Sequence, residues 1–249
     1  MCFAGLYDTV SSYGFKLIGD SYINNTAELN LKAVRQAKKV IQLVAAEEHR
    51  KNFSLTNVNS AGFKMHEIFL PGVHSDIGGG YRDNAKEDQD VHWSFDQKSA
   101  EEDRSYLIAA GWYTEKELTL KKSSHRRGKH QVREVTLNAK RENLKNHYSR
   151  IPLHIMARLA RESKISINSK LERDDDIPPE LGDVKSKLDS YVNKVIGSKD
   201  KKSSPKDWLE KKSWLCSLRH DYLHFSARYE FGHEPCLDNG KRYRKQYEG

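Results

Sequence analysis

The sequence predicts an α/β fold that consists of the last strands of a mostly parallel sheet, followed by a mainly helical region. A short apolar run, FAGLY at 3–7, is typical of a parallel strand that is covered on both faces, and MHEIFL at 65–70 is a second strand candidate. Further along, IPLHIMARLA at 151–160 has a helical apolar face and a proline in its first turn. Because two strands do not make a stable parallel sheet alone, the chain is expected to be the second half of a larger fold.

The helices of the first half are expected from spacing and capping residues. A helix is predicted from Asn30 toward Phe53, because Asn30 suits an N-cap and apolar residues recur after it at near-helical spacing: Leu31, Val34, Ile41 and Val44. Ser99 with Glu102 makes a capping box for a second helix, which Gly111 closes.

The later segments differ in composition. Residues 172–183 are acidic and contain prolines, and residues 197–205 read GSKDKKSSP, so both are expected to be loops. A final helix is predicted over 207–225, where tryptophan and leucine recur at helical spacing.

The composition describes a polar chain of 249 residues, with 37% hydrophobic and 31% charged residues. No apolar run approaches the ~18 residues that crossing a bilayer needs. Met1 is followed by CFAG without a basic region, so we expect no secretory signal peptide and synthesis in the cytoplasm. The three cysteines, Cys2, Cys216 and Cys236, include no C-x-x-C pair, which argues against a disulfide framework and a cysteine zinc site.

Positive charge is concentrated in one segment. Residues 121–150 contain ten Lys or Arg against two Glu, a local excess of eight that equals the net charge of the whole chain, +8. Such a segment can attract phosphate on lipid headgroups or nucleic acid. The alternative to phosphate binding is that this segment is a solvent-exposed insertion, and that its charges serve only to keep it soluble. Tyr148 is the one aromatic residue in the segment, so a stacking platform for nucleic acid is poorly supported.

Two residues that follow the predicted strands suit acid–base chemistry. Asp8 directly follows FAGLY, and His74 follows EIFLPG. In α/β-hydrolases the nucleophile, the acid and the histidine occur in this chain order. The histidine accepts the proton of the nucleophile, and the carboxylate fixes the tautomer of the ring. The plainer alternatives are a turn-forming aspartate and a histidine that caps the next element.

Three motifs carry a resemblance to a known family. GLYDTVSSYG, QLVAAEEHRKNF and LPGVHSDIGGGY, in this order, resemble an uncharacterised α/β-hydrolase domain family that includes phospholipase effectors of bacterial type VI secretion. Its members typically show G-[VL]-[WFY]-D-T-V, H-x-[VL]-A-x-D-E-x-R-x-x-F and [FL]-P-G-x-H-x-D-[VI]-G-G-G-Y. LRHDYLHFSARY and DNGKRYRKQYEG also resemble the ends of some members. The resemblance is most specific over 1–115.

Carried over by motif, the resemblance makes Asp8 the triad acid and His74 the general base. Asp76 and the glycines Gly78, Gly79 and Gly80 lie in the same motif, and their expected role is to shape the turn that presents His74.

The middle motif departs from the family pattern. Gln42 stands where the family has a histidine, and Glu47-Glu48 replaces Asp-Glu. We expect both changes to affect the packing of a helix more than the chemistry.

The nucleophile is the larger departure. The family uses the serine of a G-x-S-x-G elbow upstream of the D-T-V strand, but MCFAGLY precedes Asp8 and the rest of the sequence contains no such motif. Ser75 and Ser11 lack an elbow, and Ser21 and Ser60 lie in incomplete versions of the motif.

Two further reactive groups have plain explanations. Cys2 is expected to be a small buried apolar residue at the edge of the first strand. His220 and His224 resemble a zinc pair at i, i+4. No third ligand is evident, so core or surface histidines are the better explanation, and no cofactor or metal is expected.

The resemblance therefore implies three parts and one function. Residues 1–115 are expected to be the C-terminal part of a hydrolase catalytic domain, 116–150 a basic insertion, and 151–249 a mainly helical region that completes or caps the hydrolase. The chain would be a fragment of a serine ester hydrolase for phospholipids, inactive until an upstream polypeptide supplies the serine, and exported by type VI secretion. The alternative is a non-catalytic module whose basic segment binds an anionic membrane, a protein or, less favoured, nucleic acid.

Overall fold

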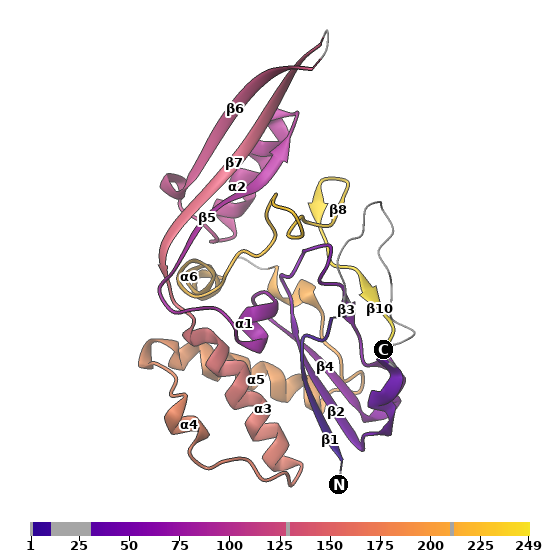
Figure 1. Cartoon of the computed structure of the whole chain (residues 1–249). Coiled ribbons are helices and arrows are strands. Elements are labelled where there is room, and N and C mark those ends of the chain that lie inside the picture. Colours follow the sequence, from indigo (N-terminus) through magenta and orange to yellow (C-terminus); the bar gives the residue numbers. More distant parts are fainter. Residues whose placement is uncertain (1, 11–30, 128–129, 210–211) are drawn as a thin grey trace.

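A three-stranded parallel sheet forms one half of the molecule (Figure 1). The computed structural model describes residues 2–10, 31–127, 130–209 and 212–249. The strand order is β1-β2-β4, and both pairs are parallel. The three strands are β1 (Phe3–Tyr7), β2 (Lys39–Ala45) and β4 (Met65–Leu70). Parallel strands end at the same edge of a sheet, so the residues that follow β1, β2 and β4 meet there.

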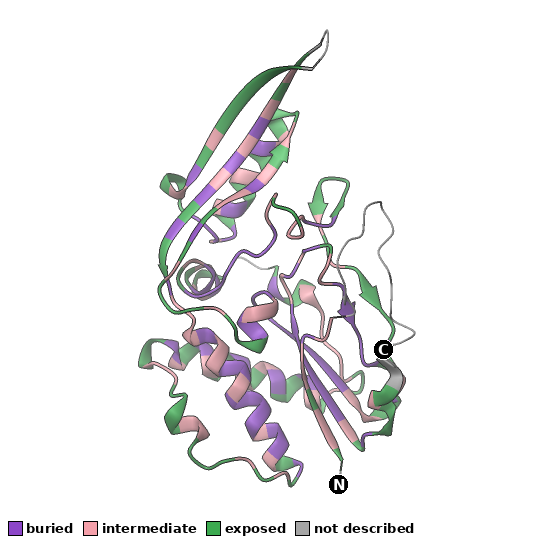
Figure 2. Cartoon of the chain, in the orientation of Figure 1, coloured by how far each residue is buried: buried purple, intermediate pink, exposed green. Residues whose placement is uncertain are grey.

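Helices cover one face of this sheet, and α3 (Arg150–Glu162) and α5 (Gly182–Gly197) lie beside it in Figure 1. The buried face of α3 is continuous in Figure 2 because Ile151, Ile155 and Leu159 repeat every four residues. The shorter helices α1 (His74–Gly78) and α4 (Leu171–Asp174) follow β4 and α3 in the chain.

The second half of the molecule is an antiparallel sheet in the order β5-β7-β6. Its strands are β5 (Ala85–Ser94), β6 (Leu118–Arg127) and β7 (His130–Leu144), and α2 (Gln97–Ala109) packs against β5 and β7. The β6–β7 hairpin extends away from the rest of the molecule (Figure 1). Inward-facing residues of β7 are buried near its base, and exposed residues predominate toward the tip (Figure 2).

The C-terminal segment, residues 213–249, contacts both the parallel and the antiparallel sheet regions. It contains α6 (Ser213–Asp221), the small hairpin of β8 (Leu237–Asp238) and β9 (Lys241–Arg242), and β10 (Gln246–Tyr247), which pairs in parallel with β3 (Leu55–Thr56). Short 3₁₀ helices occupy Leu31–Gln36, Asn59–Lys64, Glu115–Glu117, His147–Ser149, Pro179–Leu181 and Pro205–Trp208.

A buried ion pair joins the antiparallel sheet to the C-terminal segment. Arg141 of β7 donates to the Glu87 carboxylate of β5, with an Nη2–Oε2 distance of 2.6 Å. Nη1 is within hydrogen-bonding distance of backbone carbonyls at the end of α6, and Nη2 donates to the Leu223 carbonyl just beyond it over 2.9 Å. Both side chains are almost fully buried, so each charge depends on the other.

The structure confirms a mixed α/β fold with the two expected strands in parallel, and it corrects several expected elements. The helix predicted toward Phe53 is wrong: residues 39–45 form β2, and Asn30 lies outside the described residues. The apolar residues of β2 are buried on both faces of the strand, and such a run also fits helical spacing over a short window. Residues 118–127 and 130–144, which span the expected basic insertion, form two of the three strands of the antiparallel sheet.

Smaller corrections concern helix ends. Asp96 caps α2, because its carboxylate accepts from the backbone of Lys98 and Ser99. The acidic segment expected to be a loop contains α4 and leads into α5, which the sequence did not predict. The final helix is shorter than expected, and a separate 3₁₀ turn ends at Trp208. Within the described residues, no helix is long and apolar enough to cross a membrane.

Gly111 ends α2 in a conformation that only glycine adopts easily, with φ of 81°. A Cβ there would lie 2.4 Å from the Cys216 Cα of α6. We expect Gly111→Ala to lower the free energy of unfolding by more than about 2 kcal/mol, measured by denaturant unfolding. Gly197→Ala is the matched control, because no atom lies within 4 Å of its Cβ position, and its change should stay below about 1 kcal/mol. Equal effects of the two substitutions would contradict this packing.

Candidate active site

Asp8 lies immediately after β1, at the edge of the parallel sheet where the strands end. Its side chain is fully buried, and the Ala45 backbone N–H at the end of β2 donates to Oδ1 over 2.8 Å. Its φ of 46° is unusual for a residue other than glycine. The chain thus turns sharply as β1 ends, and the carboxylate lies over the end of the neighbouring strand.

His74 reaches this carboxylate from the end of β4, which is separated from β1 by β2. The turn after β4 places His74 at the start of α1, and its Nδ1 lies 2.8 Å from Asp8 Oδ2. The ring packs edge-on against Phe53 with a centroid distance of 5.1 Å. The side chain keeps 29% of its surface exposed. Within the described residues, no hydrogen bond reaches Nε2, the ring nitrogen that faces away from Asp8.

Arg244 supplies the counter-charge, and the sequence analysis did not find it. Its two terminal nitrogens lie 2.5 Å from Asp8 Oδ1 and 2.8 Å from Oδ2, a bidentate ion pair across 236 residues. Nε also donates to the Phe53 carbonyl over 2.7 Å. The signal available in the sequence was the resemblance of DNGKRYRKQYEG to the ends of family members, which marks the segment but not the residue.

The electrostatics keep the Asp8 carboxyl ionised. Burial raises the pKa of Asp8, but the charge of Arg244 and the hydrogen bonds from His74 and Arg244 outweigh it, so the pKa lies below its usual value. An ionised carboxylate only accepts hydrogen bonds, so it requires a proton on His74 Nδ1. In the neutral ring, Nε2 then carries the free lone pair.

Two adjacent carboxylates hold the loop that carries His74. Glu48 accepts a hydrogen bond from the His74 backbone N–H over 3.2 Å, and it also binds Arg50 and Ser226. Burial raises the pKa of Glu48, but hydrogen bonds and charge from Arg50 outweigh it, so the pKa is lowered. Glu47 accepts from the Gly72 backbone N–H over 2.9 Å. The pair therefore fixes the loop rather than the packing of a helix, which corrects the earlier expectation.

Gln42, the other departure from the family pattern, lies on β2 and not on a helix. It is fully buried and donates to the Thr56 carbonyl and to Glu67. Within the described part of the chain its side chain makes no hydrogen bond to His74 or Asp8, and it links β2 to β3 and β4.

Asp76 is turned away from His74. One oxygen accepts from the Val73 backbone N–H over 3.0 Å, and the other lies 2.8 Å from His224 Nδ1. The His224 ring stacks on Tyr81 at a centroid distance of 3.5 Å. Asp76 thus closes the first turn of α1 and ties it to the C-terminal region.

The glycine run follows α1. Gly78 is the last residue of the helix, and Gly79 and Gly80 have φ of 76° and 141°. The chain reverses at these two residues after α1, which fits the expected role in shaping this turn; that role stays a prediction.

The other reactive groups lie elsewhere. Cys2 is exposed, so its expected burial is wrong, because β1 is an edge strand of its sheet. Ser75 follows His74 on α1, and Ser11 lies outside the described residues, as does Ser21. His220 lies near Glu117, whereas His224 binds Asp76, so the two do not converge on one site. The described residues contain no cluster of three metal-binding side chains.

The geometry defines an acid–histidine couple on a mixed α/β fold. Comparisons with known proteins point to a particular family. Residues 1–107 match the model described as "T6SS, Phospholipase effector Tle1-like, catalytic domain". The structure is similar to one titled "Structure of the Tle1 effector bound to the VgrG spike from the Type 6 secretion system", with a TM-score of 0.64 and 20% identity. That likeness covers 99% of this chain but 57% of the effector.

These findings support a relation to the type VI secretion phospholipase effectors and show a shared fold. A search of curated proteins found no match. The chain spans little more than half the length of the effector that it resembles, 57%.

Removing the charge of Arg244 tests the buried pair. We expect Arg244→Met to lower the free energy of unfolding at pH 7 by about 3–5 kcal/mol, because Asp8 would remain buried without its cation. The pKa of Asp8 is lowered in the folded chain, so the stability it contributes is present above its usual value of 3.8 and is lost as pH falls through the lower folded value. The difference in free energy of unfolding between the wild-type chain and Arg244→Met should therefore become smaller in acid. Denaturant unfolding at several pH values measures it.

Lys245→Met removes the same charge from the neighbouring exposed residue and serves as the control. It should change stability by less than about 0.5 kcal/mol. A cost for Arg244→Met that does not vary between neutral and acidic pH would contradict an ionised Asp8.

Proposed function

We propose that this chain carries the acid and the base of a serine ester hydrolase that acts on phospholipids, as a relative of the type VI secretion effectors. One observation carries the proposal: Asp8, kept ionised by Arg244, lies 2.8 Å from His74 Nδ1 and leaves Nε2 available as a base. The match of residues 1–107 to the effector catalytic domain supports the substrate class.

The reaction would use this couple as follows. A serine hydroxyl attacks the acyl carbonyl carbon of the phospholipid, and His74 Nε2 accepts the serine proton. Asp8 holds the ring and stabilises the imidazolium, which then donates its proton to the departing lysophospholipid oxygen. Water hydrolyses the acyl-serine in a second step with the same histidine as base.

The serine would come from a polypeptide outside these 249 residues. The sequence contains no G-x-S-x-G elbow. Among the described residues, β1 pairs with β2 alone, so its other edge is open to a further strand. A parallel sheet is normally covered and extended on both sides, and strand addition at an open edge is a common mode of assembly. Alone, the chain should therefore not hydrolyse phospholipid.

Export by a type VI secretion system, with a spike protein as carrier, is part of the same proposal. It rests on the similar structure, in which the Tle1 effector is bound to the VgrG spike. The domain division at residues 115 and 150 remains part of the proposal, with the β6–β7 hairpin as the basic insertion.

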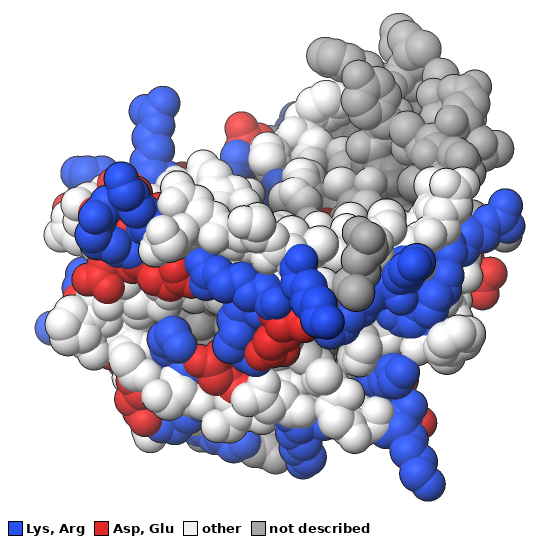
Figure 3. Space-filling view, turned by 90° about the horizontal axis from the view of Figure 1, so that it is seen from below, with Lys and Arg blue, Asp and Glu red and all other residues white. Residues whose placement is uncertain are grey.

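A second candidate function is binding of an anionic membrane surface by the β6–β7 hairpin. Lys121, Lys122 and Arg133 are exposed on the hairpin, which stands clear of the body (Figure 1). Elsewhere, basic and acidic residues are interspersed: Figure 3 shows both kinds side by side on the face seen from below. Helix ion pairs such as Arg158–Glu162 and Lys185–Asp189 neutralise charge there. Binding through the hairpin would weaken steeply as salt rises.

The coding DNA upstream of Met1, translated in all three frames, tests the hydrolase proposal first. We expect a G-x-S-x-G reading frame that runs into this one, directly or after a single shift. The joined protein should release fatty acid from phospholipid vesicles, and Asp8→Asn or His74→Ala should slow that release by more than about 100-fold.

His220→Ala is the matched control, because this histidine is partly exposed on α6, pairs with Glu117 and should leave the rate unchanged. Absence of such a reading frame, or full activity of His74→Ala, would overturn the proposal and leave binding by the hairpin as the candidate function.

A further inference from the structure

A second acid–histidine couple lies between β5 and α2, and this one includes a serine. His92 Nδ1 lies 3.1 Å from Asp103 Oδ2, and His92 Nε2 lies 3.2 Å from Ser99 Oγ. The three side chains thus form a continuous hydrogen-bonded chain from carboxylate to hydroxyl, at the distances that a nucleophile and its base require. None of these residues belongs to the Asp8–His74 site.

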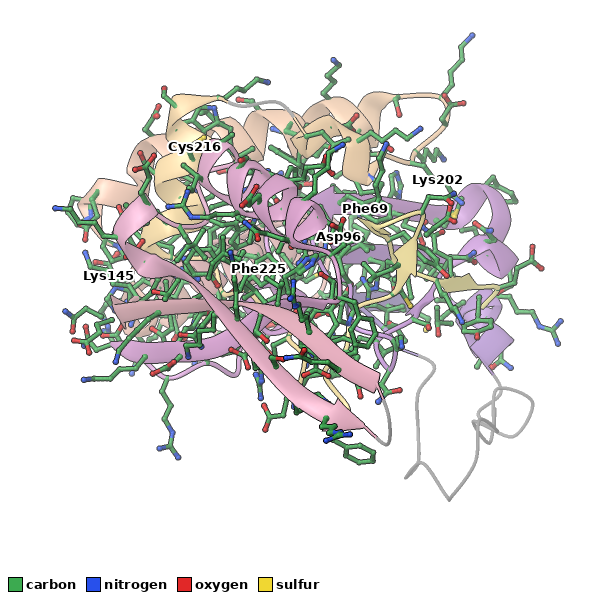
Figure 4. The ribbon with its side chains drawn as sticks, turned by 90° about the horizontal axis from the view of Figure 1, so that it is seen from above. Phe69, Asp96, Lys145, Lys202, Cys216 and Phe225 are labelled. Atoms are coloured by element: carbon green, nitrogen blue, oxygen red, sulfur yellow. The ribbon has the colours of Figure 1, made fainter. Side chains whose placement is uncertain are left out.

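The local fold explains why the three meet. Ser99 and Asp103 are four residues apart on α2, so both face the same way, toward β5. Asp96, which Figure 4 labels, fixes the start of the helix by accepting from the Ser99 backbone N–H over 3.0 Å. His92 lies on β5 next to a bulge in its pairing with β7, and bulges redirect side chains.

The acid of this second couple is held in the same way as Asp8. Arg242 donates to both oxygens of Asp103, over 2.6 Å and 2.7 Å. Burial raises the pKa of Asp103, but hydrogen bonds from His92 and Arg242 and the charge of Arg242 outweigh it and lower the pKa to about 2. Arg242 and Arg244 are alternate residues of one segment, so a single stretch of chain supplies the cation for both couples.

The ionised acid determines the proton positions. Asp103 accepts only, so the neutral His92 ring carries its proton on Nδ1 and presents a free lone pair at Nε2. Ser94 Oγ donates to the Asp96 carbonyl over 2.8 Å. The Ser99 hydroxyl can donate to the same carbonyl over 3.1 Å or to Ser94 Oγ over 3.2 Å, and by rotation of its proton to His92 Nε2 over 3.2 Å. Of these groups, only the Ser99 hydroxyl lies within reach of His92 Nε2 and can donate to it.

Aromatic side chains lie beside the couple. Ser99 and His92 are partly exposed, and Trp93 and Phe95 form an exposed aromatic pair on the same stretch of chain, with ring centroids 4.8 Å apart. The Tyr229 ring lies 6.3 Å from the His92 ring.

Tyr229 also lines a neighbouring open pocket of about 360 Å³, which borders the couple through Tyr229 and Trp93 and is not lined by Ser99, His92 or Asp103. The other residues that line it are Asp90, Trp93, Glu230, Phe231 and Glu234. The aromatic rings suit an uncharged or cationic molecule, and the carboxylates repel an anionic one.

We propose that Ser99, His92 and Asp103 form a second nucleophilic site, which accepts the acyl group of a small, uncharged or cationic ester. Ser99 Oγ forms a bond to the ester carbonyl carbon while its proton passes to His92 Nε2. The bond from carbon to the leaving oxygen then breaks, and His92 donates the proton to that oxygen. Water attacks the acyl-Ser99, gives one proton to His92, and the proton returns to Ser99 Oγ as the acid leaves.

The 249-residue chain itself provides the test. It is incubated with a fluorophosphonate probe, and the modified residue is located by mass spectrometry of its peptides. We expect the adduct on Ser99, and a burst of p-nitrophenol from p-nitrophenyl acetate at neutral pH. A p-nitrophenyl ester with an added carboxylate should react at least about tenfold more slowly, because of the acids that line the cavity.

Variants separate reactivity from simple exposure. His92→Gln should slow labelling by about 100-fold, the typical contribution of a general base, and Ser99→Ala should abolish it. Ser105→Ala is the control, since this serine is exposed on the same helix and bonds to the Glu101 carbonyl. Melting by circular dichroism checks that each variant is folded.

An adduct elsewhere, no adduct on the wild-type chain, or a labelling rate that His92→Gln leaves unchanged in a folded protein would overturn the proposal. The test needs no upstream polypeptide, so its outcome does not depend on the phospholipid hydrolase proposal.

Discussion

The ion pair between Asp8 and Arg244 connects the start of the chain to its end, and both the sheet edge and the candidate site depend on it. A fully buried carboxylate is costly unless a cation and hydrogen bonds compensate it, and Arg244, His74 and the Ala45 backbone together do so. The pair therefore requires the C-terminal segment to return across the end of β1. This return also places Arg242 against Asp103, so one segment supplies the cation for both acids, and each acid in turn contacts a histidine.

The candidate site is held by hydrogen bonds to the backbone of its loop more than by packing of the Asp8 and His74 side chains. Glu48 binds the His74 backbone and Glu47 binds the Gly72 backbone, so the loop is fixed on both sides of Val73. The histidine ring itself stays partly exposed. A rigid loop with an accessible ring is what a general base requires, because its position must be set before the substrate arrives.

The sequence allowed prediction of the parts that depend on local chemistry. The apolar run before Asp8, the strand that ends at Pro71 and the proline-started helix at 150–162 could be identified because each carries its own pattern. The strand at 39–45 was mistaken for a helix, because a short apolar run fits both periods. Asp8 and His74 were found through motifs, but Arg244 and Arg242 were not. Their roles come from contacts across more than a hundred residues, which no local spacing encodes.

The orientation of His74 is the central claim, and nitrogen NMR of the histidine side chains tests it most directly. The signals are assigned by loss in His74→Gln and recorded at alkaline pH, where the rings are neutral. The account predicts that His74 carries its proton on Nδ1 and that Asp8→Asn shifts this signal, because the ionised acceptor is gone. A proton on Nε2, or a signal that Asp8→Asn leaves unchanged, would contradict an acid–base couple at this site.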